Sequence, residues 1–397
     1  MKVISQNAHL DLKSPGTWIR LEPDRRFNPL CRQCGRPGIV HAQGMQRIIR
    51  DLDFGPAQTF LQVQYRRVWC EQCGKANVEQ LSFADAGKRI THRLARYIYE
   101  LSKLMTVRDV ARHLDLDPKT VKAVDKYFLD KEFGRTDCEG LSIIAIDEIA
   151  LRKGHMGYMT VVLNYLTGRV VWMGEGRNME TLDAFFKEMT DAQKQAIEAV
   201  AMDMWEPYIN RVRRHCPQAK IVFDLFHLVK AYGEVIDVVR REEVRKAATK
   251  EDGAYVKGSR YVLLKNRENL KPDERVRLRE LLQANERLNA VYVLKDQLKM
   301  IYHYRRRGWA KKALDQWCAL AEEVDHRAMR RFIGRIRYFE YGILNHCDYA
   351  ISTSPLEGVN NKIKVIKRKA YGFHDPHYFA LKVKQALPGH KSTTEIG

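Results

Sequence analysis

The chain has 397 residues, of which 45% are hydrophobic and 30% charged, a composition typical of globular proteins with buried cores. No apolar run approaches the roughly 18 residues that a membrane span needs. Residues 1–13 also lack the apolar core of a signal peptide. We therefore expect a cytoplasmic protein with no membrane partner, long enough for two or three domains.

The charge balance is strongly basic. Lys and Arg total 69 against 49 Asp and Glu, which gives a net charge of +20. This excess favours a polyanionic partner, and nucleic acid is the expected one because each neutralised phosphate releases counterions. A basic surface that only serves solubility is the alternative, and the motifs below argue against it.

Four of the eight cysteines form two close pairs near the N-terminus, Cys31-Arg-Gln-Cys34 and Cys70-Glu-Gln-Cys73. A glycine follows each pair and suits a tight turn. Two such turns would surround one structural, tetrahedral Zn²⁺ with four thiolates. Disulfides or redox dithiols are the alternatives, and a cytosolic location disfavours disulfides. We expect a zinc-binding module over residues 1–84, with a strand at Phe60–Trp69 and with His41 as a less favoured ligand.

The segment Thr106–Val124 has the rhythm of a helix-turn-helix. Thr106 is expected to cap the first helix, with Asp109 three residues later. Asp117 is expected to cap the second helix, with Pro118 as its first residue. The residues pointing toward double-stranded DNA would then be Lys119, Thr120 and Lys122. An ordinary helical hairpin is the alternative.

Three apolar, strand-like runs end in an acidic residue. They are Leu141–Asp147, Ala196–Asp203 and Lys220–Asp224, and two more strands (Tyr158–Leu163 and Arg169–Met173) and a helix (Leu182–Met189) lie between the first and the second. With a further helix before the last run, the order is βββαβαβ, that of the ribonuclease-H-like fold. In that fold the first and fourth strands lie side by side and present their acids to one point.

A third acid is expected from a later helix, within Ser352–Lys369. Ser354 would cap it, Pro355 would be its first residue, and Glu357 would lie in its first turn, followed on the same face by Asn361, Lys364 and Arg368. Carboxylates are suitable ligands for two Mg²⁺ or Mn²⁺ ions that promote in-line phosphoryl transfer. The alternatives are a plain capping box at Glu357 and helix-cap or loop roles for the two aspartates.

Several longer stretches resemble the ISL-three family of bacterial insertion-sequence transposases, which use DDE chemistry. They are Ile146–Glu148 with Arg152–His155, Gly174–Arg177, Asp203–Tyr208, Phe223–His227, and Ser354–Asn361 with Tyr371-Gly372. The resemblance implies excision and insertion of a mobile element, with Asp147, Asp203 and Glu357 as the catalytic, magnesium-binding acids. Asp224 is an alternative second acid, and Asp224 with His227 resembles an accessory motif of related transposases. We prefer Asp203 because the strand count places it on the fourth strand.

The expected fold class is a multidomain α/β protein. A zinc-binding module and a helix-turn-helix precede a ribonuclease-H-like catalytic domain that an α-helical insertion interrupts. The expected divisions are residues 1–84, 85–137, 138–229, 230–350 and 351–397. The insertion would grip DNA, with Tyr302–Trp309 as a phosphate and stacking patch or, equally, a solvated helix end.

The expected function is binding of the element's terminal inverted repeats, followed by strand cleavage and strand transfer into target DNA by a homo-oligomer. Lys364 and Arg368 are expected to contact DNA beside the acids. Two alternatives stay open. One is a domesticated DNA-binding regulator without cleavage, and the other is a junction-resolving nuclease of the same fold.

Overall fold

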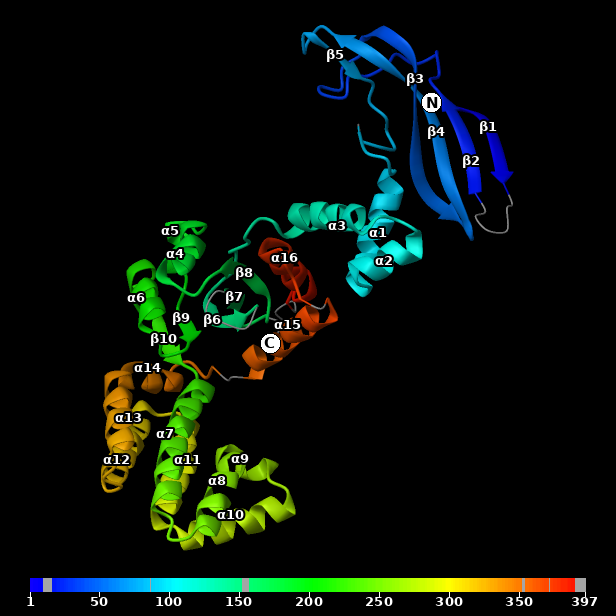
Figure 1. Cartoon of the computed structure of the whole chain (residues 1–397). Helices are drawn as coiled ribbons and strands as arrows, with labels where there is room; N and C mark the ends of the chain where they lie inside the picture. Colours follow the sequence, from blue (N-terminus) through cyan, green and yellow to red (C-terminus); the bar gives the residue numbers. More distant parts are fainter. Residues whose placement is uncertain (10–15, 86, 152–156, 352–353, 371, 390–397) are drawn as a thin grey trace, which may run out of the picture. The chain divides into compact units, whose positions relative to one another are not determined.

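The structure is a computed structural model, and it describes residues 1–9, 16–85, 87–151, 157–351, 354–370 and 372–389. The chain divides into two compact units, Met1–Glu132 and Phe133–Gly397 (Figure 1). Within the described residues, every helix is too short or too polar to cross a bilayer.

The first unit starts with a five-stranded sheet in the order β1-β2-β4-β3, with β5 paired to β4. β3 and β4 form a long antiparallel hairpin that turns at Gly55, whose φ of +61° favours glycine. Alternating residues such as Ile49, Leu61 and Val63 bury one face. The expected strand at Phe60–Trp69 is confirmed as part of β4. The strands are β1 Lys2–His9, β2 Gly16–Glu22, β3 Ile39–Phe54, β4 Ala57–Cys70 and β5 Lys75–Val78.

Three helices complete the first unit: α1 His92–Leu104, α2 Val107–Leu114 and α3 Pro118–Phe133. They enclose a small apolar core that includes Ala111. Asp51 of β3 fastens the start of α1 to the sheet, because it accepts hydrogen bonds from Thr91 Oγ1 at 2.6 Å and from Arg93 Nε at 2.7 Å. The sheet and the helices therefore form one packed unit.

The second unit is built on a five-stranded sheet in the order β10-β9-β6-β7-β8. β6 pairs antiparallel with β7 and parallel with β9, and β10 pairs parallel with β9. The expected adjacency of the first and fourth strands is thus confirmed. The fourth strand is shorter than expected, because a short helix precedes it. The strands are β6 Ile143–Ala150, β7 Tyr158–Asn164, β8 Val170–Glu175, β9 Ala199–Met202 and β10 Lys220–Phe223.

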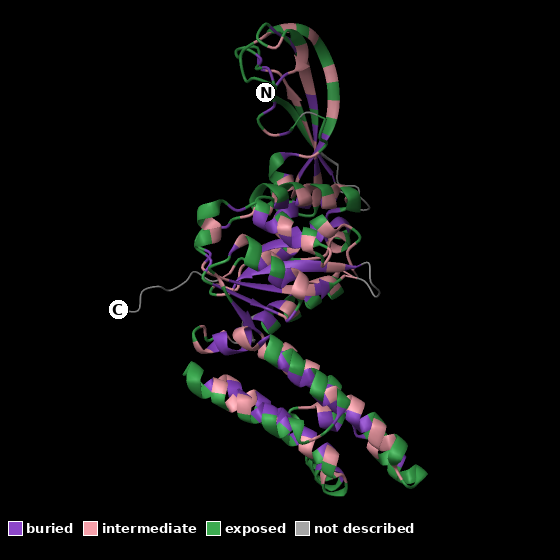
Figure 2. Cartoon of the chain, turned by 90° about the vertical axis from the view of Figure 1, so that its left-hand side faces the viewer, coloured by how far each residue is buried: buried purple, intermediate pink, exposed green. Residues whose placement is uncertain are grey.

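Helices cover both faces of this sheet, so its strands are largely buried (Figure 2). Side chains of α15 and α16 pack on one face together with Ala145, Val161 and Ala201. Side chains of α4 and α6 pack on the other face. The expected helix at Leu182–Met189 is present but begins earlier, because Asn178 caps it by accepting from Thr181 N at 2.9 Å. The helices are α4 Met179–Lys187, α5 Asp191–Gln195, α6 Glu206–His215, α15 Ser354–Lys369 and α16 Pro376–Ala386.

A helical region separates β10 from α15. Apolar residues at helical spacing from Val276 to Leu298 lie on two helices that are divided at Asn285, whose side chain caps the second helix by accepting from Leu288 N at 2.9 Å. The helices are α7 Leu225–Lys246, α8 Lys250–Gly258, α9 Arg260–Leu264, α10 Pro272–Ala284, α11 Glu286–Met300, α12 Arg307–Glu322, α13 Arg327–Tyr338 and α14 Glu340–Leu344, with 3-10 turns η1 Arg267–Asn269, η2 Ile301–His303 and η3 Asn345–Cys347.

The end of the helical region returns to the sheet and covers its edge strand, β10. Asn345 Nδ2 donates to Ile221 O at 2.8 Å. A Cβ atom at Gly342 would lie 2.4 Å from the ring of Phe223, so glycine permits this close approach. The helical region is therefore joined to the sheet directly beside the C-terminal end of β10.

Lys295 is a buried charge that links α11 to the end of α9. It is 2% exposed, and its ammonium group donates to the carbonyl oxygens of Leu263, Leu264 and Lys265 at 3.0, 2.9 and 2.7 Å. These carbonyls end α9, where a cation is favoured. Burial lowers the pKa of Lys295 to about 8, so the amine is still charged at neutral pH.

We expect Lys295→Met to lower the free energy of unfolding by about 3 kcal/mol, because it leaves buried carbonyls without donors. Lys299→Met is the matched control one turn later. Lys299 is half-buried and donates to a side-chain oxygen of Asn266, so its loss should cost under about 1 kcal/mol. Urea unfolding followed by circular dichroism measures both, and equal losses would contradict the role given to Lys295.

Candidate functional site

The two cysteine pairs lie on two tight turns of the first unit. Cys70 ends β4, and the turn after it leads into β5. Gly74 N donates to Glu71 O at 3.3 Å, and in the other turn Gly35 N donates to Cys31 O at 2.8 Å. Both glycines have positive φ angles, +70° at Gly35 and +64° at Gly74. The glycine-dependent turns expected from the sequence are therefore confirmed.

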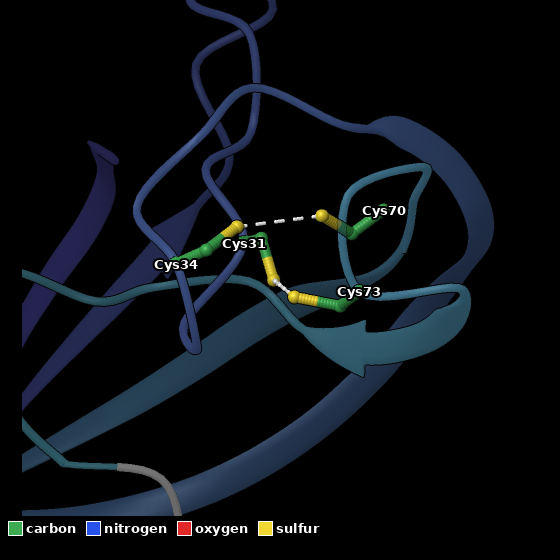
Figure 3. Close-up of side chains that lie close together, drawn as sticks. All are labelled: Cys31, Cys34, Cys70 and Cys73. Atoms are coloured by element: carbon green, nitrogen blue, oxygen red, sulfur yellow. Dashed lines mark hydrogen bonds between the residues drawn. The ribbon is translucent and has the colours of Figure 1, made fainter.

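The four cysteines point toward one another (Figure 3). Their sulfur atoms all lie within 4.8 Å, with Cys31 Sγ 4.0 Å from Cys73 Sγ and Cys34 Sγ 3.4 Å from Cys70 Sγ. A disulfide needs about 2.05 Å. Four thiolates around a tetrahedral Zn²⁺, with Zn–S bonds of about 2.3 Å, lie about 3.8 Å apart. The cluster therefore has the donor set and the spacing of a zinc site.

The backbone around the first pair also favours thiolate. Hydrogen bonds from the backbone N–H groups of Cys34 and Gln33 lower the pKa of Cys31 to about 6. Asn77 Nδ2 lies 3.7 Å from the same sulfur. His41 is exposed on β3 and is not in the cluster, so it is a surface residue and not an additional ligand.

The helix-turn-helix has the caps that its sequence predicts. Thr106 Oγ1 accepts from Asp109 N at 3.2 Å and donates to Asp109 Oδ2 at 2.6 Å. Asp117 Oδ1 accepts from Lys119 N at 2.7 Å, and Pro118 is the first residue of α3. Asp115, with a φ of +51°, ends α2. The three residues expected to face DNA differ in exposure: Lys119 is exposed, whereas Thr120 and Lys122 are half-buried.

Three aspartates lie at one edge of the sheet in the second unit. Ala145 pairs with Ala201, so continuing the parallel register for two residues brings Asp147 level with Asp203. Phe223 pairs with Met202, which brings Asp224 level with Asp203 as well. Neighbouring strands lie about 4.8 Å apart, so the three carboxylates belong to one neighbourhood.

Asp147 and Asp203 also face the same side of the sheet. Ala145 and Ala201, two residues before them on β6 and β9, lie in the apolar cluster beneath α15 and α16. Because side chains alternate along a strand, the two aspartates point toward α15. Backbone N–H groups orient them, since Glu148 N donates to Asp147 Oδ1 at 2.7 Å and Met204 N donates to Asp203 Oδ1 at 2.6 Å.

Helix α15 reaches this edge through a residue that the sequence analysis did not select. Asn360 Nδ2 donates to Asp147 Oδ2. Asn361, the residue expected from the sequence, is exposed, as are Lys364 and Arg368. Asn360 and Asn361 lie three and four residues after Glu357, so helical spacing places both on the face of Glu357 and does not choose between them.

Glu357 is exposed in the first turn of α15. Among the described residues, only the four clustered cysteines form a group of three or more side chains whose metal-binding atoms all lie within 4.8 Å of one another. The structure thus places α15 in contact with Asp147, but the Glu357 carboxylate does not lie within 4.8 Å of both Asp147 and Asp203. The side chains of Ser354 and Pro355 lie outside the described residues.

Asp224 is engaged by its own helix. Its Oδ1 accepts from Phe226 N at 2.7 Å as the N-cap of α7, and its Oδ2 lies 3.4 Å from His227 Nδ1. Burial alone would lower the pKa of His227, but the close contact with Asp224 and the charges of Asp203 and Asp147 raise it above its usual value. His227 therefore lies within the electrostatic reach of all three aspartates.

Glu148 is a further acid at this edge that the sequence analysis left without a role. Burial raises its pKa, the charge of Arg177 lowers it, and Asp147 and Asp203 raise it further. The nearby Tyr208 side chain lowers its pKa slightly, and the Tyr208 hydroxyl lies 2.6 Å from Thr160 Oγ1. In the sequence, Glu148 could be recognised as a candidate because it directly follows Asp147, which places its side chain on the opposite side of the strand.

The segment Tyr302–Trp309 is only partly the patch that was expected. Tyr302 is half-buried, stacks on His346 with ring centroids 4.5 Å apart, and donates to Phe223 O at 3.1 Å. A stacking role for Tyr302 on nucleic acid is therefore wrong, because its ring already stacks on His346. Residues 303–309 are exposed, including Trp309.

Comparison with known proteins places these features in a family. Residues 144–383 match the transposase model of the ISL3 (ISL-three) family, and residues 79–129 match the model described as the helix-turn-helix domain of transposase family ISL3. The chain is 43% identical to the transposase for insertion sequence element IS1001 of Bordetella parapertussis, over 94% of this chain and 91% of that protein. It is 27% identical to the transposase for insertion sequence element IS1557 of Mycobacterium tuberculosis, over 94% of this chain and 89% of that protein. The chain belongs to the ISL3 family of DDE transposases.

Proposed function

We propose that this transposase binds the terminal inverted repeats of its insertion sequence, cleaves DNA strands there and transfers them to target DNA. One observation carries the proposal: Asp147 and Asp203 are level on adjacent parallel strands, and Asn360 holds α15 against Asp147. Glu357 lies one helical turn before Asn360 on that helix. Asp147, Asp203 and Glu357 are the proposed catalytic acids.

The proposed fold of the catalytic part is ribonuclease-H-like. The strand order β10-β9-β6-β7-β8 supports it. β6, β7 and β8 are antiparallel neighbours, whereas β9 and β10 run parallel to β6. We also propose the expected division of the chain, with the helical region over about residues 230–350 as an insertion in this domain.

The proposed acids suit two Mg²⁺ or Mn²⁺ ions, because carboxylate oxygens are hard ligands. Such ions, when bound, supply Lewis-acid stabilisation of the attacking and leaving oxygens in phosphoryl transfer. The chain's own residues prepare the ligands. Glu148 N and Asn360 Nδ2 fix the two oxygens of Asp147, and Met204 N fixes one oxygen of Asp203.

Asp203 is a better proposed ligand than Asp224. One oxygen of Asp224 caps α7 and the other lies 3.4 Å from His227 Nδ1, so its contacts tie it to α7, whereas Asn360 ties Asp147 to α15. Asp203 has one oxygen bonded to Met204 N, which leaves the other available on the side that faces α15. We assign Asp224 and His227 an accessory role in fixing the edge of the sheet.

The first unit is the proposed reader of the terminal repeats. The helix-turn-helix presents Lys119, with Thr120 and Lys122 beside it, and the cysteine cluster would hold one structural Zn²⁺. Lys364 and Arg368, both exposed on α15, are proposed to bind DNA beside the acids. Both DNA ends of the element must be held at the same time, so we propose a homo-oligomer on DNA.

The test is a cleavage assay with the full chain and labelled duplexes. We expect Mn²⁺-dependent nicking at the end of the element's own repeat and joining of the freed 3′ end to a second duplex. A scrambled repeat is the control and should be neither bound tightly nor cut. Binding without nicking would identify a regulator, and cutting of branched DNA of any sequence would identify a junction-resolving nuclease.

A further inference from the structure

Arg177 lies at the same edge of the sheet as the proposed catalytic acids. β8 is antiparallel to β7, which is antiparallel to β6, so β8 runs in the direction of β6. Glu148 pairs with Thr160, and Thr160 pairs with Gly174. Arg177 follows the end of β8 by two residues, so it leaves the sheet at the end where Asp147 and Asp203 lie, on the side that Glu148 faces.

The position of Arg177 is set by a tightly held turn. Gly176 N donates to Tyr158 O at 2.8 Å, and Gly176 O accepts from Thr160 Oγ1 at 2.9 Å. The φ angle of Gly176 is +103°, and a Cβ atom there would lie 2.7 Å from Thr181 Oγ1. Because another side chain would strain this turn, the glycine fixes the point from which Arg177 leaves the backbone.

Tyr158 then fixes the side chain. The Arg177 guanidinium carbon lies 4.2 Å from the centre of the Tyr158 ring, which is a short cation–π contact. Stacking uses the flat face of the guanidinium group and leaves the N–H groups at its rim. Among the described residues, no hydrogen bond or ion pair engages those N–H groups, and the side chain is half-buried.

A cation is needed at this position for an electrostatic reason. Asp147, Glu148, Asp203 and Asp224 concentrate negative charge at the edge that a DNA backbone must approach. A cation in the same place reduces the repulsion of the phosphates. The planar guanidinium group is well suited to this role, because two parallel N–H groups match two phosphate oxygens.

We propose that Arg177, held by Tyr158, binds a backbone phosphate of the DNA strand that enters the catalytic edge. Arg177 is thus a further DNA-binding residue, separate from the helix-turn-helix and from α15. The inference rests on the proposed function, because the ligand is the DNA of that reaction.

The test measures binding of the full chain to terminal-repeat duplexes in which single phosphates near the cleaved bond are replaced by uncharged methylphosphonates. For the wild type we expect a loss of about tenfold in affinity at one or two adjacent positions. Arg177→Ala should bind the unmodified duplex about tenfold more weakly and show no further loss at those positions. Its plot of log affinity against log salt should be shallower by about 1.

Arg213→Ala is the matched control, because Arg213 is also stacked on a tyrosine, 4.9 Å from the ring of Tyr341, but on α6. It should keep the methylphosphonate pattern of the wild type. Tyr158→Phe keeps an aromatic face and should behave as the wild type, whereas Tyr158→Leu should weaken the same phosphate contact.

Two failures can be told apart. A wild type that neither prefers nor cuts terminal-repeat DNA would overturn the proposed function. A wild type that is sensitive at one phosphate, with Arg177→Ala equally sensitive there, would overturn only this assignment. Arg177 would then act only through its charge, which lowers the pKa of Glu148.

Discussion

Replacement of Asp203 by asparagine is expected to reduce DNA strand cleavage by about 10³-fold or more, a loss of several kcal/mol of transition-state stabilisation. Asparagine has the same shape and can still accept the hydrogen bond from Met204 N. It lacks the anionic oxygen that a divalent cation needs. Asp147→Asn and Glu357→Gln should have effects of the same order, because each removes one carboxylate from the proposed set.

Asp224→Asn should behave differently. Asparagine is as good an N-cap as aspartate, so α7 and the hydrogen bond to Phe226 N should persist. Only the charge beside His227 is lost, and we expect cleavage to fall by about tenfold or less. This contrast separates the two candidates for the second acid, both of which follow a buried strand.

The measurement is single-turnover cleavage of a labelled terminal-repeat duplex in Mn²⁺, with DNA binding followed by fluorescence anisotropy. All four variants should bind DNA within about threefold of the wild type, because removing an acid does not weaken attraction to phosphate. Asp191→Asn is the control, an exposed acid in the first turn of α5 whose loss should leave cleavage unchanged. An inactive Asp224→Asn beside an active Asp203→Asn would reverse the assignment of the second acid.

The catalytic sheet was predictable because its strands carry a strong local signal. Apolar runs that end in an acid marked β6, β9 and β10, and the alternation of strands and helices indicated which strands are neighbours. The cysteine turns and the caps at Thr106 and Asp117 were predictable for the same reason, because a few adjacent residues determine each of them.

Contacts between distant residues were not predictable from one sequence. Asn360 bonds to Asp147 across more than two hundred residues, and no local pattern distinguishes it from Asn361. The stacking of Tyr302 on His346 and the contact of Arg177 with Tyr158 are tertiary in the same way. The break at Asn285 is not evident from the apolar spacing, which continues through it, whereas its capping bond to Leu288 N decides the local structure.

Replacement of Cys34 by serine is expected to remove bound zinc and to weaken binding to terminal-repeat DNA by more than about 100-fold. Structural zinc sites contribute roughly 10 kcal/mol or more to the folding of small modules, so three remaining thiolates cannot hold the two turns together. Cys34 is the exposed member of the cluster, so the substitution removes little buried surface and tests ligation itself. Asp51 of the same sheet is hydrogen-bonded to the start of α1. Loss of zinc is therefore expected to disturb the DNA-binding helices as well as the sheet.

Metal analysis of the purified chain should give one zinc per wild-type molecule and less than about one-tenth in Cys34→Ser or Cys70→Ser. Cys347→Ser is the control, because that half-buried cysteine lies in the second unit and should leave both zinc and DNA affinity unchanged. Alkylation of the denatured wild type without reductant should label all four clustered cysteines, as thiolates released from a metal require. Resistance of either pair to alkylation until reductant is added would instead identify a disulfide. One zinc retained by Cys34→Ser would remove that residue from the ligand set.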